Sequence, residues 1–169
     1  IEDHGSDVLR LAIAWAANPG KQIHWNYSLL APARKLLRRL ITLADQTTKM
    51  AGSPIGKPVI APRHLQQMES SLAIDIERVA AFISDYRPNA ALRIIDRRIS
   101  ILSRQMHKCL VDGTMHPDDQ GTIKRSLKLV VQTLSPFAPF HCEEIWEMLG
   151  GTSLVSITPW PQTHATGLT

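Results

Sequence analysis

Cysteine is nearly absent from the sequence. Cys109 and Cys142 are the only two thiols among 169 residues. Two cysteines cannot supply the disulfide framework of a small secreted scaffold, and they fit a chain that stays in a reducing compartment. We therefore expect both thiols to be buried or incidental.

The chain also lacks a long apolar run. Its most apolar early stretch, VLRLAIAWAA at 8–17, is short and is interrupted by Arg10, whereas a membrane span needs about 20 apolar residues. The first residues, IEDHGSD, are acidic where a secretory signal peptide carries positive charge. These absences predict a cytoplasmic protein with no membrane partner, and a first residue other than Met suggests a fragment or a processed chain.

Motifs that gather catalytic or metal-binding side chains are missing as well. Seven histidines occur without an HExxH or a CxxC pattern. His141 and Glu144 stand three residues apart, but one such pair is not a metal site. No glycine-rich loop follows a strand, which excludes a phosphate-binding fingerprint. The sequence therefore predicts no catalytic residue, no metal and no cofactor in this chain.

What the sequence does contain is helical periodicity along nearly its whole length. Apolar residues make up 44% of the chain, enough for one domain with a substantial core. Prolines and glycines separate the periodic segments, and five of them fall within the eleven residues 52–62. Helices are expected over 6–17, 28–50, 62–86, 89–111, 117–134 and 139–149. We predict an all-α antiparallel bundle of five to six helices over 1–161, with an extended or disordered tail at 162–169.

Local signals frame the first and last of these helices. Ser6 is the expected N-cap of the first helix. Pro136 ends the fifth helix, because the residue before a proline avoids helical geometry, and Pro139 can open the sixth at a first-turn position. The glycines at 150–151 end that helix. The segment from Ser153 onward is expected to be extended or disordered.

Positive charge is in excess, with 19 Lys and Arg against 15 Asp and Glu and a formal net charge of +4. At about 100° per residue, the helix over 89–111 has one apolar side, and basic and hydroxyl residues fill an arc of about 80° opposite it. The apolar side comprises Leu92, Ile95, Ile99, Leu102, Met106 and Leu110. The polar side comprises Arg93, Arg97, Ser100, Arg104 and Lys108. This row contains no acid, and we expect Asp96 to lie beside it, nearer to Arg98.

Two interpretations of such a row are open. An ordinary solvated helix face mixes acids with bases, which form weak i,i+4 pairs. A row of one sign suits a phosphate backbone, where Arg and Lys give affinity without reading bases. The helices over 28–50 and 117–134 add further outward bases. These are Arg34, Arg38 and Lys49 in the first case and Lys124 and Lys128 in the second.

Three segments, in order, resemble one family. IEDHGSDVLRLAIAWAA is similar to the segment after the KMSKS loop of class I aminoacyl-tRNA synthetases, often YGADVLRL. IHWNYSLLAPARKLLRRL resembles the next family segment, an aromatic residue before a basic, leucine-rich helix. LSPFAPFHCEEIWEMLGG followed by SITPWP resembles the family's LAPFAPHIAEELWEMLG and PWP. Residues 53–120 match by helical pattern alone. The combination is most similar to leucyl-tRNA synthetases, with the valyl, isoleucyl and methionyl enzymes as relatives.

The resemblance implies an α-helical anticodon-binding domain. Such a domain packs against a catalytic domain and holds the inner bend and anticodon stem of a tRNA, here tRNA(Leu), in a monomeric enzyme. The parent enzyme attaches leucine to tRNA with ATP, and the sites for ATP and Mg belong to its catalytic domain. The HIGH and KMSKS signatures are absent from this chain.

The resemblance also assigns roles to residues. Asp7 and Arg10 match the Asp and Arg of GADxLR and are expected to form a structural hinge next to the KMSKS loop, as a salt-bridged pair with other partners. Trp25 matches a packing aromatic, and Trp146 matches a core tryptophan. The expected phosphate contacts are Arg34, Lys35, Arg38, Arg39, Arg93, Arg97, Arg104, Lys108, Lys124 and Lys128. Pro136 and Pro139 are expected to shape the corner before the last helix.

The chain departs from the family pattern at one point in particular. Phe140 stands where leucyl enzymes often carry His, and His141 takes an apolar position. This puts in doubt a polar contact near the tRNA or the catalytic domain. A specialised copy, for example one that resists a synthetase inhibitor, is one interpretation.

Two other classes of function are open at this point. A helical protein-interaction module would show an apolar patch, rather than a basic row, on the helices over 28–50 or 89–111. A metal-dependent helical enzyme would bind a metal ion after purification.

Overall fold

The computed structural model describes residues 5–17, 22, 24–111 and 115–162. This part of the chain is helical, as predicted, and it contains no strand. The α-helices are α1 (Ser6–Ala16), α2 (Leu30–Lys49), α3 (Pro62–Ser84), α4 (Pro88–Val111), α5 (Pro117–Leu134) and α6 (Pro139–Met148). Three short 3₁₀ helices accompany them, namely η1 (Tyr27–Leu29), η2 (Met50–Gly52) and η3 (Val155–Ile157).

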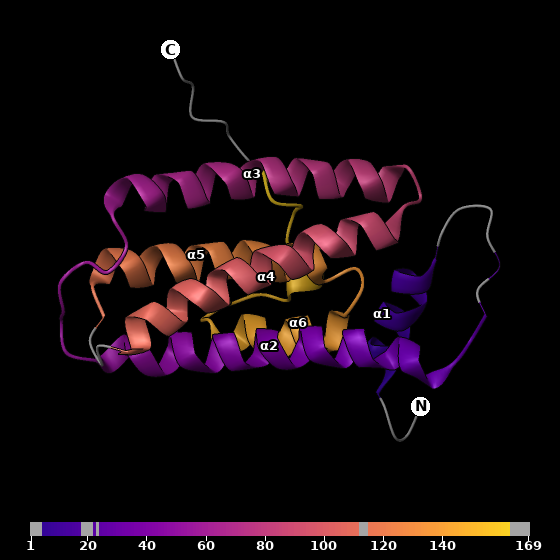
Figure 1. The fold of residues 1–169 in the computed structure, drawn as a ribbon, viewed down its shortest axis with the longest axis horizontal. Coiled ribbons are helices and arrows are strands. Elements are labelled where there is room, and N and C mark those ends of the chain that lie inside the picture. Colours follow the sequence, from indigo (N-terminus) through magenta and orange to yellow (C-terminus); the bar gives the residue numbers. More distant parts are fainter. Residues whose placement is uncertain (1–4, 18–21, 23, 112–114, 163–169) are drawn as a thin grey trace, which may run out of the picture.

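The central element of the bundle is α4. It contacts α1, α2, α3 and α5, and in Figure 1 it crosses the middle of the molecule between α2 and α3. The helices α2 and α4 run in one direction, whereas α3 and α5 run in the opposite direction. The predicted antiparallel bundle is therefore correct for successive helices from α2 to α5, and α2 and α4, which are not successive, form a parallel pair within it.

The core forms where the apolar sides of the helices meet. From α4, Leu92, Ile95, Ile99, Leu102 and Met106 are buried as predicted, while Leu110 packs at the edge of the core and is partly buried. From α2, Leu36, Leu37, Leu40, Leu43 and Ala44 are buried, also as predicted. Burial of these faces fixes the rotation of α2 and α4, so their opposite sides face solvent.

The helix starts differ in part from the sequence-based expectation. Ser6 does not cap α1, because the residue before the helix is Gly5, with φ of 71°, and no side chain provides a cap hydrogen bond. The segment expected to be one helix over 28–50 begins with η1, where the Asn26 side chain accepts the Ser28 N–H at 2.9 Å, and α2 follows. Pro32 lies in the first turn of α2, where its missing N–H costs no helical hydrogen bond.

The end of α6 follows a Schellman pattern, as the paired glycines suggest. The Gly150 N–H bonds the Glu147 carbonyl at 2.8 Å, and the Gly151 N–H bonds the Trp146 carbonyl at 2.8 Å. Gly150 has φ of 76°. A Cβ at Gly151 would lie 2.1 Å from the Trp146 indole, so only glycine fits against this ring.

The segment after α6 is ordered on the bundle as far as it is described. Leu154 and Thr158 are extended on either side of η3, so from Ser153 the expectation of an extended segment is correct in part and the alternative of disorder is wrong there. Val155 is 2% exposed, and Trp160 packs against the core. The Glu143 carboxylate accepts the N–H groups of Val155 and Ser156 at 2.7 and 3.0 Å. Of the predicted tail, residues 163–169 lie outside the described residues.

Candidate nucleic-acid interface

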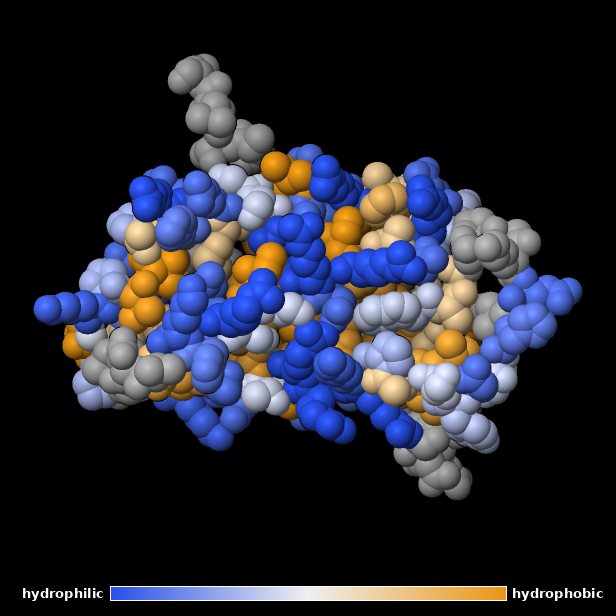
Figure 2. Space-filling view, in the orientation of Figure 1, coloured by the Kyte–Doolittle hydropathy of each residue, from blue (hydrophilic) through white to orange (hydrophobic). Residues whose placement is uncertain are grey.

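Two neighbouring helices carry most of the unbalanced positive charge. Each of α2 and α4 contains five Lys or Arg residues and one acid. In Figure 2, strongly hydrophilic side chains form a band across the middle of the face where α4 and α2 lie. We call the outward sides of these two helices the basic face.

Arg39 joins the two helices of the basic face. Its guanidinium donates to the Ser100 hydroxyl at 2.5 Å and forms an ion pair with Asp96. The side chains of Arg39 and Asp96 are about one-third exposed, at 30% and 32%. Asp96 therefore pairs with α2, which corrects its expected position near Arg98. Arg39, predicted to contact phosphate, is engaged within the protein and neutralises the one acid of α4.

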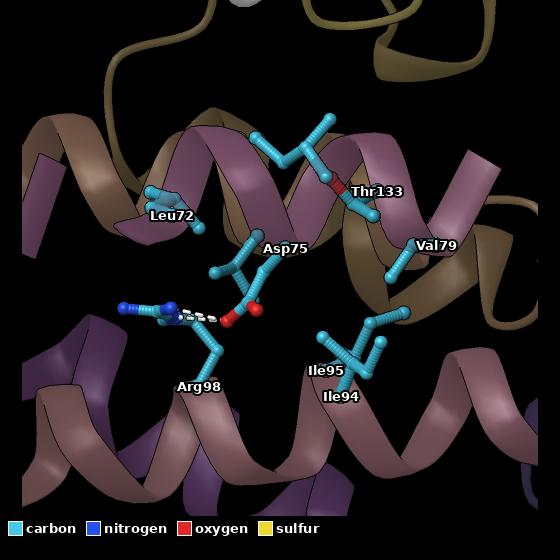
Figure 3. A pocket seen from close by; sticks show the side chains of 9 residues that line it. Leu72, Asp75, Val79, Ile94, Ile95, Arg98 and Thr133 are labelled. Carbon is cyan, nitrogen blue, oxygen red and sulfur yellow. Dashed lines mark hydrogen bonds and ion pairs between the residues drawn. The ribbon is translucent and has the colours of Figure 1, made fainter. Parts of the chain in front are cut away.

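Arg98 faces the opposite way, into the contact between α4 and α3. Its guanidinium pairs with Asp75 and also bonds the Ser71 hydroxyl at 3.0 Å and the Ser71 carbonyl at 2.9 Å. Figure 3 shows this pair beside a small apolar pocket lined by side chains such as Leu72 and Ile95. Arg98 is 6% exposed, so it connects two helices and is closed to an outside partner.

The remaining bases of the two helices are exposed, and of these Lys49 pairs with Asp45 on its own helix. Lys35, Arg38, Arg93, Arg97, Arg104 and Lys108 are all exposed and form no ion pair with another described residue. Arg34 is exposed as well. From Arg93 to Lys108 the row on α4 extends about 22 Å along the helix. Because its one acid is paired with Arg39, the row presents positive charge to solvent without compensation.

Apolar side chains hardly contribute to this surface. Among the described residues, Ile41, at 36%, is the one large exposed apolar side chain on α2, and α4 has none. An apolar patch on these helices was the signature expected of a protein-interaction module. The basic face therefore favours a polyanionic partner over an apolar one.

The two predicted contacts on α5 lie elsewhere. The Lys128 ammonium stands 4.9 Å from the centroid of the Trp146 ring and donates to the Gly150 carbonyl at 3.2 Å. The Lys124 ammonium lies 4.0 Å from the position that a Cβ on Gly150 would take. Both lysines meet the C-terminal end of α6, whose exposed carbonyls attract cations. Lys128 has a structural role there that the sequence pattern did not indicate.

Asp7 and Arg10 of α1 are not paired with each other. The Asp7 carboxylate is fully buried, accepts the His141 N–H at 2.8 Å and lies 2.8 Å from the His141 imidazole Nδ1. This N–H belongs to the first turn of α6, where the helix itself offers it no acceptor. The Arg10 guanidinium lies over the Phe140 ring at 5.8 Å.

These contacts account for the departure from the family pattern at 140–141. Phe140 and His141 each meet one of the two family-like residues of α1, so the four side chains form one joint between α1 and α6. Asp7 is thus paired with a partner on another helix, as expected, whereas Arg10 meets an aromatic ring where a charged partner was expected. The one signal in the sequence was the departure itself, since nothing local links residue 7 to residue 141.

The two tryptophans expected to pack behave differently. Trp25 is 47% exposed, so its expected packing role is wrong for the described part of the chain. Trp146 is partly buried and packs at the edge of the core, between Gly151 and Lys128. Pro139 opens α6, as predicted. α5 ends just before Pro136, also as predicted, but its C-cap residue Ser135 keeps helical φ and ψ of -53° and -32°, so the expected avoidance of helical geometry before the proline is wrong.

Burial removes the reactive potential of the thiols. Neither cysteine is part of a disulfide and both are buried, as predicted. Burial raises the pKa of Cys142, and the nearby charges of Asp7 and Glu143 raise it further, so the thiol stays protonated. Within the described residues, no group of three or more His, Cys, Asp or Glu side chains comes together as a metal site would require.

The helices of the described residues are all too short or too polar to span a membrane. The charges of α2 and α4 therefore fall into two groups. Arg39 and Arg98 connect helices, and the other bases are exposed on the basic face.

Comparisons with known proteins agree with this architecture. Residues 66–168, more than half of the chain, match the family model described as the anticodon-binding domain of tRNA ligase. The leucine–tRNA ligase of Thermosynechococcus vestitus is 29% identical over 173 residues, which cover 99% of this chain and 19% of that protein. The enzyme of Proteus mirabilis is 26% identical over 162 residues, covering 95% and 18%. The chain thus spans about a fifth of the length of these curated relatives.

A solved structure shows the same fold. The Agrobacterium radiobacter K84 agnB2 LeuRS, in a ternary complex with tRNA and LeuAMS, superposes with a TM-score of 0.75 over 95% of this chain and 20% of that one, at 24% sequence identity. The resemblance noted in the sequence is confirmed over nearly the whole chain. The chain belongs to the family of anticodon-binding domains of tRNA ligases.

Proposed function

We propose that this chain is the tRNA-holding domain of a leucine–tRNA ligase and that its basic face binds the phosphate backbone of the tRNA. The observation that carries the proposal is the uncompensated row on α4, joined to α2 by the Arg39–Asp96 pair. The names of the relatives and the tRNA in the ternary complex with a related fold support the same partner.

The phosphate contacts are assigned to the outward bases of both helices. These are Arg34, Lys35, Arg38, Arg93, Arg97, Arg104 and Lys108. Such contacts release counterions and give affinity and register, but they do not read bases. The face therefore supports the body of the tRNA, here tRNA(Leu), and leaves the choice of amino acid to other parts of the enzyme.

The parent enzyme attaches leucine to tRNA with ATP, under this proposal. ATP and Mg²⁺ belong to a catalytic domain outside this chain, and this chain supplies no catalytic residue. A monomeric state and a cytoplasmic location are part of the same proposal. Charging assays of the complete enzyme with leucine, valine, isoleucine and methionine separate it from the related synthetases.

The test reverses two charges in the middle of the row. The double variant Arg97→Glu/Arg104→Glu should weaken tRNA binding and make the negative slope of log K against log salt less steep by about 2, because two phosphate contacts are lost. Titrations at several salt concentrations measure both quantities. Lys57→Glu/Arg63→Glu makes the same change in net charge at exposed positions outside α2 and α4 and serves as the control. Equal loss in both double variants, or no loss in the first, would refute the assignment.

A further inference from the structure

Tyr86, in the turn between α3 and α4, has an unusual backbone conformation. Its φ is 55°, and it is the one residue other than glycine with a positive φ in the described chain. It follows Asp85, the C-cap residue of α3. The Tyr86 N–H bonds the Ile83 carbonyl at 3.0 Å, and the Arg87 N–H bonds the Phe82 carbonyl at 2.8 Å. This pair of bonds is a Schellman motif with tyrosine at the left-handed position.

Glycine is the usual residue at that position, because a Cβ is strained there. The chain itself provides the comparison. The Schellman motif at the end of α6 has the same two hydrogen bonds and places Gly150 at the left-handed position. The backbone of the α3–α4 turn therefore gives no reason for tyrosine.

Packing gives no reason either. Tyr86 is 84% exposed, the highest value among the large exposed apolar and aromatic residues described. The strained conformation is thus not offset by burial of the ring. Backbone strain of this kind clusters at active sites, ligand clamps and switch regions.

The surroundings of the ring limit the kind of ligand that would suit it. Arg87 follows it and places its guanidinium over the Phe82 ring at 5.0 Å. The basic row of α4 begins at Arg93, about 8 Å along the helix from its first residue. Asp85 is exposed in the same turn and repels a phosphate there. A flat, uncharged ligand linked to a phosphate chain fits this arrangement, and an unpaired nucleobase has this chemistry.

We propose that Tyr86 is a stacking platform for an unpaired base of the RNA whose phosphates lie along α4. The inference rests on the proposed function and adds a contact to a base at the end of the row. Aromatic rings stack on bases of any identity, so the contact would hold a looped or splayed nucleotide without selecting its sequence.

The test uses three variants of Tyr86 in the complete chain. Tyr86→Gly removes strain and ring together, so its melting temperature should rise by about 2–4 °C while affinity for tRNA falls at least about fivefold. Tyr86→Asn tolerates the left-handed backbone without a ring and should show the same loss of affinity. Tyr86→Phe keeps the ring and should bind as the parent chain does.

The outcomes separate this inference from the function on which it rests. Unchanged tRNA binding by the Gly and Asn variants, together with loss in Arg97→Glu/Arg104→Glu, overturns the stacking contact and keeps the phosphate face; the exposed ring would then serve a protein partner or none. Unchanged binding in all of these variants refutes the proposed function itself. A Gly variant that is both more stable and weaker in binding supports the inference, because a purely structural role of Tyr86 predicts no such opposition.

Discussion

The helices α4 and α6 use their charges in opposite ways. The first has five bases and one acid, and four of the bases point to solvent, whereas the second has three acids and no base. Around α6, three charged groups act as connectors: Asp7 reaches the first turn, Lys128 the last, and Glu143 holds the segment that follows. The other two acids of α6, Glu144 and Glu147, are exposed. The comparison teaches that charge alone does not mark a binding surface, because pairing inside the fold decides which charges a partner can reach.

The sharpest test of this comparison uses two adjacent arginines on α4. Arg98→Ala should lower the free energy of unfolding by about 3–5 kcal/mol, since Asp75 would be left nearly buried without its partner. Arg97, the preceding residue, is exposed. Arg97→Ala should change the free energy of unfolding by less than about 0.5 kcal/mol and should weaken tRNA binding instead. Denaturant unfolding and tRNA titration of both variants measure the two effects. Similar effects of the two substitutions would break the division into inward and outward charges.

The next effect concerns the joint between α1 and α6. Asp7→Ala should cost about 2–3 kcal/mol, because the His141 N–H loses a charged acceptor in a buried position. Asp118→Ala removes an acid whose side chain is 79% exposed and serves as the control, with an expected change under about 0.5 kcal/mol. Thermal or denaturant unfolding gives both values. If Asp7→Ala changes the free energy of unfolding no more than the control does, α6 is held by its apolar side alone.

The helices and the outward row could be predicted from the sequence, whereas the pairing of charges could not. α5 occupies the predicted 117–134, because proline starts and apolar periods are local signals. The partners of Asp96, Arg98 and Asp7 come from other helices, 57, 23 and 134 residues away. Which residue becomes the partner depends on the position of one helix along the axis of the other. The periodicity within a single helix carries no information about that position.

Tyr86 shows a second limit of the sequence. Glycine after a helix indicates a left-handed end, so Gly150 was expected to end α6, but a tyrosine at that position gives no such signal. The segment after α6 was misjudged for a related reason. Its order depends on the Glu143 carboxylate and on burial of Val155, and both are contacts with the bundle.

The smallest expected effect is the loss of stability in acid at the contact between the Glu143 carboxylate and the N–H groups of Val155 and Ser156. Burial of the Glu143 carboxylate pushes its pKa up, but hydrogen bonds from the Ser156 hydroxyl and from the N–H groups of Val155 and Ser156 outweigh it, so the pKa lies below its ordinary value of 4.5. A pKa lowered by folding gives stability that is complete above about pH 4.5 and is lost as the pH falls through the folded value. Because the site is near the surface, the loss is small.

Glu143→Gln isolates this contribution, since its amide oxygen is a weaker acceptor that does not titrate. The variant should be slightly less stable than the parent chain at pH 7, and the difference should disappear as the pH falls below 4.5. Glu144→Gln, exposed on the same helix, is the matched control. Unfolding curves at a series of pH values, followed by tryptophan fluorescence, measure the difference. A difference in stability between Glu143→Gln and the parent chain that stays the same in acid would show that ionisation of Glu143 does not hold η3. The segment after α6 would then be held by packing, as the core side of α4 is.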